Sequence, residues 1–93
     1  DYHFTAFIGI LLTKSNRTQE VLRELVEIPN VIEASVISGK YNIFCKIRAK
    51  NTEDAKRIIY QIDDIQDVMR TESMISMEEY ISDKNRLIAA VSI

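Results

Sequence analysis

The sequence predicts a single α+β domain in which strands and helices follow the order strand-helix-strand-strand-helix-strand. Ninety-three residues suit one domain with one modest core. Apolar residues alternate in four segments and recur at helical spacing in two others. Each helical segment follows a strand, so that residues 4–38 and 43–79 form two similar halves.

The first half opens with a strand over residues 4–13 that is apolar on both faces. Its alternate positions place one apolar set on one face, namely Phe4, Ala6, Ile8, Ile10 and Leu12. Phe7 and Leu11 lie on the opposite face, which would normally meet water in a small domain. Residues 16–28 then predict a helix, with Asn16 and Gln19 spaced as a capping box.

Two short strands follow, over residues 31–38 and 43–49, and both are rich in branched side chains. Gly39 lies between them and permits the positive φ of a tight turn. The two strands are therefore predicted to form an antiparallel hairpin.

The second half is completed by a helix over residues 51–62 and a strand over residues 68–80. Asn51 or Thr52 is the expected N-cap, and acids in the first turn favour the helix dipole. Two acids, Asp63 and Asp64, are expected at the helix end.

This order is the split βαβ of ferredoxin-like folds, an antiparallel four-stranded sheet with both helices on one face. The other face is apolar in part, so we expect the chain to dimerise through its sheet. Residues 1–80 make up the domain. Residues 81–93 form a C-terminal extension that is a fifth edge strand, a short helix folded over its own domain, or an arm that pairs with a neighbouring subunit.

Composition excludes several classes of function. A formal net charge of −2 and scattered lysines and arginines argue against direct DNA contact by this chain. No apolar run approaches the roughly 20 residues of a membrane span. Cys45 is the single cysteine and His3 the single histidine, so no metal cluster is expected. Phosphate-loop, dinucleotide and metalloprotease motifs are missing. We expect a cytoplasmic protein that is not an enzyme and has no cofactor.

The loop of residues 38–42, Ser38-Gly39-Lys40-Tyr41-Asn42, is the candidate ligand site. Tyr41 offers a ring and a hydroxyl, and Asn42 offers a donor and an acceptor. Thr71 and Ser73 place two hydroxyls on one face of the last strand. Such groups suit a small zwitterion, although, taken singly, each is better explained as a turn residue, a packed tyrosine or an exposed strand hydroxyl.

Two segments carry a resemblance to a known family. "IPNVIEASVISGKYNI" (residues 28–43) and "VMRTESMISMEE" (residues 68–79) resemble the effector (RAM) domain of the Lrp/AsnC regulators, the leucine-responsive or feast/famine family. The resemblance covers roughly residues 4–79. Gly39 and Tyr41 match the glycine and tyrosine of the family loop, and Thr71 and Ser73 its polar strand positions. Asn42 stands where the family usually has aspartate.

The resemblance implies a domain that dimerises through stacked sheets, assembles into higher oligomers and binds amino acids in clefts between dimers. Full-length members contact DNA through an N-terminal helix-turn-helix segment, which the present sequence does not include. The expected function is therefore amino-acid sensing and oligomerisation, either within a transcriptional regulator or as a stand-alone effector protein. The alternatives are an assembly module whose pocket has lapsed and an ACT-like allosteric domain of a metabolic enzyme.

Overall fold

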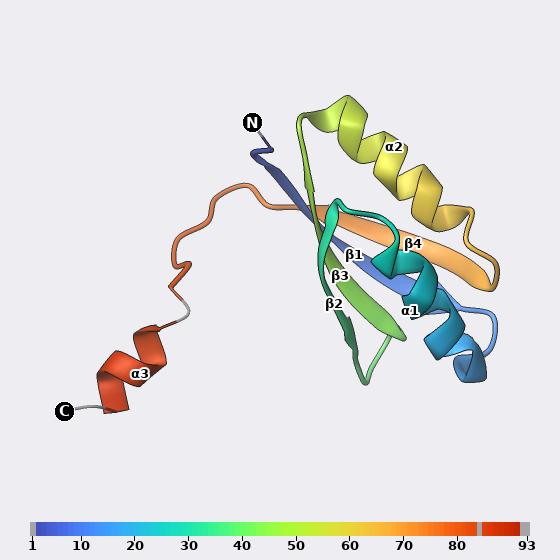
Figure 1. Cartoon of the computed structure of the whole chain (residues 1–93), viewed down its shortest axis with the longest axis horizontal. Helices are drawn as coiled ribbons and strands as arrows, with labels where there is room; N and C mark the ends of the chain where they lie inside the picture. Colours follow the sequence, from blue (N-terminus) through green and yellow to red (C-terminus); the bar gives the residue numbers. More distant parts are fainter. Residues whose placement is uncertain (1, 84, 92–93) are drawn as a thin grey trace.

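The computed structural model describes residues 2–83 and 85–91 and confirms the expected order of strands and helices (Figure 1). The strands are β1 (Phe4–Leu12), β2 (Val31–Val36), β3 (Ile43–Ala49) and β4 (Val68–Ile75). The helices are the 3-10 turn η1 (Ser15–Arg17), α1 (Thr18–Val26), α2 (Thr52–Asp63) and α3 (Arg86–Val91).

The four strands form one antiparallel sheet in the order β2-β3-β1-β4. β1 is central and pairs with β3 on one side and β4 on the other, while β2 and β4 are the edges. Figure 1 shows α1 and α2 on the same face of the sheet. The ferredoxin-like fold and the β2–β3 hairpin predicted from the sequence are therefore confirmed.

The core lies between the sheet and the two helices. Alternate residues of β1 and β3 point into it and are fully or almost fully buried, namely Ala6, Ile8, Ile10, Leu12, Ile43, Cys45, Ile47 and Ala49. Apolar side chains of the helices close it from the other side, namely Val21, Leu25, Ala55, Ile58 and Ile62. Among the described residues the buried set contains no polar or charged member. Hydrophobic burial is therefore the main interaction between these two layers.

The opposite face of the sheet carries no helix, and we call it the open face. Phe7 of β1 and Phe44 of β3 stack there with ring centroids 5.8 Å apart and planes 15° from parallel. The Lys46 ammonium lies 5.8 Å from the Phe7 ring centroid, within cation–π range. These three side chains are only partly buried. The sequence predicted that the first strand is apolar on both faces, and the open face is indeed partly apolar. The described part of the chain covers this face incompletely.

The start of the first helix differs from the expected capping box at Asn16 and Gln19. Residues 15–17 form the 3-10 turn η1, and α1 begins at Thr18 without a side-chain cap. The Thr18 hydroxyl donates to the Ser15 carbonyl at 2.7 Å. Arg17 is held at 2.8 Å by Asp67, which comes just before β4. The Arg17–Asp67 ion pair, a contact between residues far apart in the sequence, therefore holds the turn in place of a side-chain cap. By contrast, the predicted N-cap Asn51 is confirmed, since its Oδ1 accepts from the Asp54 amide.

The C-terminal part also differs from the sequence reading. β4 ends at Ile75 rather than near residue 80, and residues 86–91 form helix α3 rather than a fifth strand. Just before this helix, the Asn85 amide donates to Oδ1 of Asp83 at 2.9 Å. Figure 1 shows α3 apart from the sheet and from α1 and α2, so it is not folded over its own domain.

Candidate functional site

The loop between β2 and β3 is open and exposed at its tip. Gly39 has φ +120°, a conformation that side-chain-bearing residues rarely adopt. A Cβ at this position would meet nothing within 4 Å, so the backbone rather than space requires glycine. Ser38 and Lys40 flank it and are exposed. These three residues lie at the surface and are accessible to a ligand or a partner.

Tyr41 leaves the loop and covers the open face of β1. A Cβ on Gly9 would lie 2.8 Å from Cδ2 of the Tyr41 ring. Gly9 alternates with the buried Ile8 and Ile10, so its missing side chain would point to the open face. The glycine in the first strand is therefore explained by a close approach of the Tyr41 ring. The Lys40 ammonium lies 5.6 Å from that ring's centroid.

Asn42 makes three bonds that fasten the loop to the sheet. Its Oδ1 accepts from the Leu12 amide at 2.9 Å. Its own amide donates to the Ile10 carbonyl at 2.9 Å, and its carbonyl accepts from the Ile37 amide at 3.1 Å. The side-chain oxygen therefore satisfies the backbone of β1 where the register between β1 and β4 shifts. An aspartate here could accept the same Leu12 amide.

Thr71 and Ser73 share a face of β4, as expected, but that face is the one the helices cover. Thr71 pairs with Ile10 and Ser73 with Ile8, both of which are core residues. The Thr71 hydroxyl donates to the Asp63 carboxylate at 2.7 Å. The sheet thus lies between these hydroxyls and the Tyr41 ring.

A cleft of about 310 Å³ opens where the loop meets β4. It is lined by Lys40, Tyr41, Arg70, Thr71 and Glu72. The structure therefore brings the loop and β4 together, while Ser73 is not among the lining residues of this cleft.

Arg70 and Glu72 were missed by the sequence reading. Arg70 pairs with Leu11 and Glu72 with Gly9, so both lie on the open face beside the Tyr41 ring. The cleft thus offers two cations, Lys40 and Arg70, and one carboxylate, Glu72. Strand alternation could have found Arg70 and Glu72 only with the β1–β4 register in hand, because one residue of slip exchanges the two faces.

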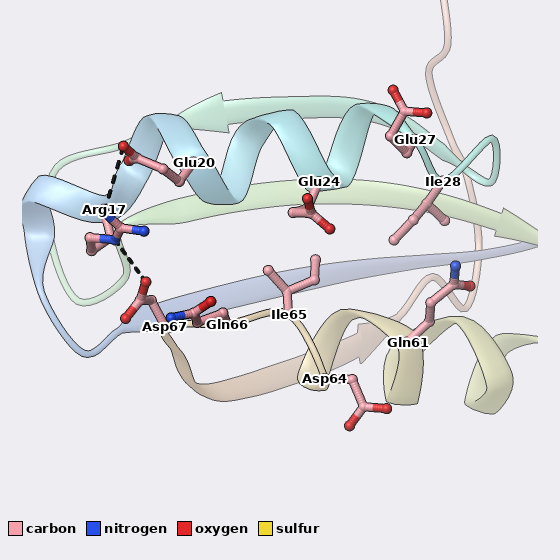
Figure 2. A pocket seen from close by; sticks show the side chains of 10 residues that line it. All are labelled: Arg17, Glu20, Glu24, Glu27, Ile28, Gln61, Asp64, Ile65, Gln66 and Asp67. Atoms are coloured by element: carbon pink, nitrogen blue, oxygen red, sulfur yellow. Dashed lines mark hydrogen bonds and ion pairs between the residues drawn. The ribbon is translucent and has the colours of Figure 1, made fainter.

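A larger cleft lies elsewhere, between α1 and the segment that joins α2 to β4 (Figure 2). It measures about 540 Å³, and half of its lining residues are acidic, namely Glu20, Glu24, Glu27, Asp64 and Asp67. Figure 2 shows Arg17 between Glu20 and Asp67, to which it is bonded at 3.7 and 2.8 Å. The Arg17–Asp67 ion pair closes one end of the cleft and connects the turn before α1 to the segment before β4.

Neither a reactive thiol nor a metal cluster is found in the part of the chain that the structure describes. Burial raises the pKa of the Cys45 thiol to about 12, so this cysteine is a core side chain rather than a nucleophile. Over residues 2–83 and 85–91, no three His, Cys, Asp or Glu side chains are placed to hold a metal ion. No helix in these ranges is long and apolar enough to cross a membrane.

Comparison with known proteins identifies the family. The model of the Lrp/AsnC ligand-binding domain matches residues 5–86. The chain belongs to the Lrp/AsnC ligand-binding domain family. The HTH-type transcriptional regulator FL11 of Pyrococcus furiosus is 31% identical to this Lrp/AsnC domain over 77 residues, which cover 83% of this chain and 50% of that protein.

Solved structures agree with this assignment. E. coli AsnC has 27% identity to this Lrp/AsnC domain and a TM-score of 0.85, over 89% of this chain and 56% of that one. The feast or famine regulatory protein of M. tuberculosis, complexed with L-methionine, has a TM-score of 0.79 over 89% of this chain and 56% of that one. Its 19% identity shows the fold alone. The chain spans about half the length of the curated relatives it matches.

Proposed function

We propose that this Lrp/AsnC domain senses a small amino acid and assembles into dimers and higher homo-oligomers. It acts without catalysis, in the control of transcription in the cytoplasm, and does not itself contact DNA. Family membership supports the ligand-binding and regulatory part, because the family is described by its ligand-binding domain and FL11 is a transcriptional regulator. The arrangement of charges beside Tyr41 supports the amino-acid part.

The cleft beside Tyr41 carries the proposal because it offers charges of both signs within a small space. An α-carboxylate would bind Arg70 or Lys40, and an α-ammonium would bind Glu72, each through charge-assisted hydrogen bonds. The Tyr41 ring, which lies among the lining residues, supplies an apolar wall. Of the remaining candidates, Thr71 also lines the cleft, while Ser38, Asn42 and Ser73 act in this proposal by shaping the loop and β4.

A second copy is expected on the open face. Phe7 and Phe44 are stacked but only partly buried, and Met74 on the neighbouring edge strand is exposed. Burying such side chains contributes about 25 cal/mol for each Å² removed from water. The cleft beside Tyr41 opens on this same side of the sheet. Ligand binding and assembly would therefore be linked through one surface.

Titration calorimetry against the twenty amino acids, with L-methionine first, tests the sensing part. We expect at least one amino acid to bind, with affinity reduced about tenfold or more by Glu72→Gln and by Arg70→Gln, since each removes one charged contact. Glu24→Gln and Arg23→Gln on the exposed side of α1 are matched controls that should leave binding unchanged. Gly39→Val should abolish binding while the fold is retained.

The Asn42→Asp variant distinguishes amino-acid sensing from the assembly-module function. Because Oδ1 of Asn42 already accepts from the Leu12 amide, a carboxylate can keep that bond and add negative charge near the cleft. Tighter binding of an amino acid is the expected result. If neither the natural chain nor Asn42→Asp binds any amino acid, the assembly-module function replaces sensing. A gel shift that shows sequence-selective, sub-micromolar DNA binding by this chain would contradict the absence of DNA contact.

A further inference from the structure

The C-terminal segment that follows β4 projects on the side of the sheet that has no helix. We call residues 77–83 and 85–91 the arm. The Ser76 amide donates to the Thr5 carbonyl at 3.0 Å, so the chain is still paired with β1 just before the arm begins. The Glu79 carboxylate then lies 3.8 Å from the Lys46 ammonium on the open face. Figure 1 shows the arm continuing away from the sheet on the side opposite α1 and α2.

The arm concentrates exposed apolar side chains in a short stretch. Met77 is 91% exposed, Tyr80 89% and Leu87 74%, and Ile81 and Ile88 are exposed as well. Helix α3 has six residues, whereas isolated helices below about 12 residues are marginal in water. A short helix that presents apolar side chains to solvent is stabilised most readily by docking against another apolar surface.

The body of the domain offers a groove of suitable chemistry. It measures about 370 Å³ and lies between α1 and the edge strand β2. Its lining is apolar apart from Glu33, and it includes Leu22, Val26, Ile32 and Ala34. Val26 is 78% exposed, and Ile32 is about half exposed. Glu33 at the groove complements Arg86, the first residue of α3.

We propose that the arm docks on a second copy of this chain, with α3 in the groove between that copy's α1 and β2. We choose a second copy as the docking partner because the arm projects into the space that a copy stacked on the open face would occupy. The family match ends at residue 86, so most of α3 lies beyond the conserved domain model. This inference rests on the proposed dimer and adds an exchange of arms to it.

Cysteine cross-linking between differently tagged chains tests the docking directly. A Leu87→Cys chain is mixed with a Val26→Cys chain under mild oxidation, and a disulfide-linked pair carrying both tags is expected. Tyr60→Cys on α2, 64% exposed, is the matched control and should give no more product than random collision. The buried Cys45 thiol does not interfere.

Truncation after Tyr80 measures how much α3 contributes to the stability of the dimer, and it keeps the Glu79–Lys46 pair. We expect the dimer dissociation constant to rise about tenfold or more, because the groove between α1 and β2 loses the apolar side chains of α3 that cover it. Val26→Glu should weaken the dimer similarly, and the truncated Val26→Glu chain should be no weaker than either change alone. Tyr60→Glu should leave the dissociation constant unchanged.

The possible outcomes test the docking of the arm and the formation of the dimer separately. If light scattering shows a dimer but cross-linking never exceeds the Tyr60→Cys control, the arm proposal is overturned and the proposed function stands. Cross-linking that occurs only when both cysteines are in one chain places α3 on its own subunit and also overturns it. A chain that stays monomeric overturns both the arm and the dimer.

Discussion

On the helix-covered face of the sheet, Ile8, Ile43 and Ile47 are completely buried, whereas Phe7 and Phe44 of the same strands are only partly buried on the open face. The first face packs against α1 and α2, which the same chain supplies. The second face has a stacked aromatic pair, a lysine over it and the start of the arm. The difference indicates that one chain completes its core but leaves the other face of its sheet incompletely covered.

Ile47→Ala gives the largest expected effect because it acts on the completed face. Ile47 is fully buried, so the substitution removes apolar contacts and leaves a cavity. We expect the free energy of unfolding to fall by about 2–5 kcal/mol in urea titrations. Tyr60→Ala, at an exposed position of α2, is the control. A loss below about 1 kcal/mol would show that the core is less complete than its burial indicates.

Phe7→Glu acts on the open face and should affect association more than folding. A glutamate at this position can pair with Lys46, whose ammonium already lies over the Phe7 ring. Burial of a phenylalanine side chain contributes roughly 1.5–3 kcal/mol, and a symmetric dimer loses two. We expect the dimer to weaken at least thirtyfold, roughly 2 kcal/mol, in light-scattering titrations. An unchanged dimer would place the interface elsewhere.

Gly9→Ala tests the contact that joins the open face to the loop. The new methyl would meet the Tyr41 ring at 2.8 Å, so the ring must shift. Overpacking of this kind costs about 1–3 kcal/mol, measured by thermal or urea unfolding.

The double variant Gly9→Ala with Tyr41→Ala should recover part of that loss, since the clash disappears with the ring. Losses that simply add would mean that the ring does not lie over Gly9. Ligand binding should fall in both single variants, because each disturbs the wall of the cleft.

Asp54 at the start of α2 gives the smallest expected effect, which depends on pH. The Lys50 amide donates to the Asp54 carboxylate, and this bond, with Arg57 nearby, lowers the pKa of Asp54 below its ordinary value of 3.8. A lowered folded pKa stabilises the fold above pH 3.8 and loses that contribution as the pH falls through the folded value.

The measurement is the free energy of unfolding of the natural chain and of Asp54→Asn across acidic pH. The natural chain should be more stable at neutral pH, and the gap should narrow as Asp54 takes up its proton. Glu53→Gln is the matched control, since Glu53 is exposed and makes only a 3.5 Å pair with Lys56. If the difference in the free energy of unfolding between the two chains stays constant with pH, the charge of the Asp54 carboxylate does not stabilise the start of α2.

The sequence by itself determined the fold. Alternation in β1 and β3, the helical spacing of the apolar residues in α1 and α2, and the cap at Asn51 are local signals, and each was found where it was expected. The need for glycine at position 39 was also local, because it follows from the φ of one residue. Such features are readable because they depend on neighbours within a few positions of the chain.

Only the tertiary structure decided which groups meet at the candidate site. Thr71 and Arg70 are adjacent in sequence, yet the β1–β4 register places the Arg70 side chain beside Tyr41 and the Thr71 hydroxyl on Asp63. The contact of Tyr41 with Gly9 and the tether of Arg17 to Asp67 join residues 32 and 50 positions apart. Long-range pairing sets these contacts, and a shift of one residue would reverse the two faces of β4.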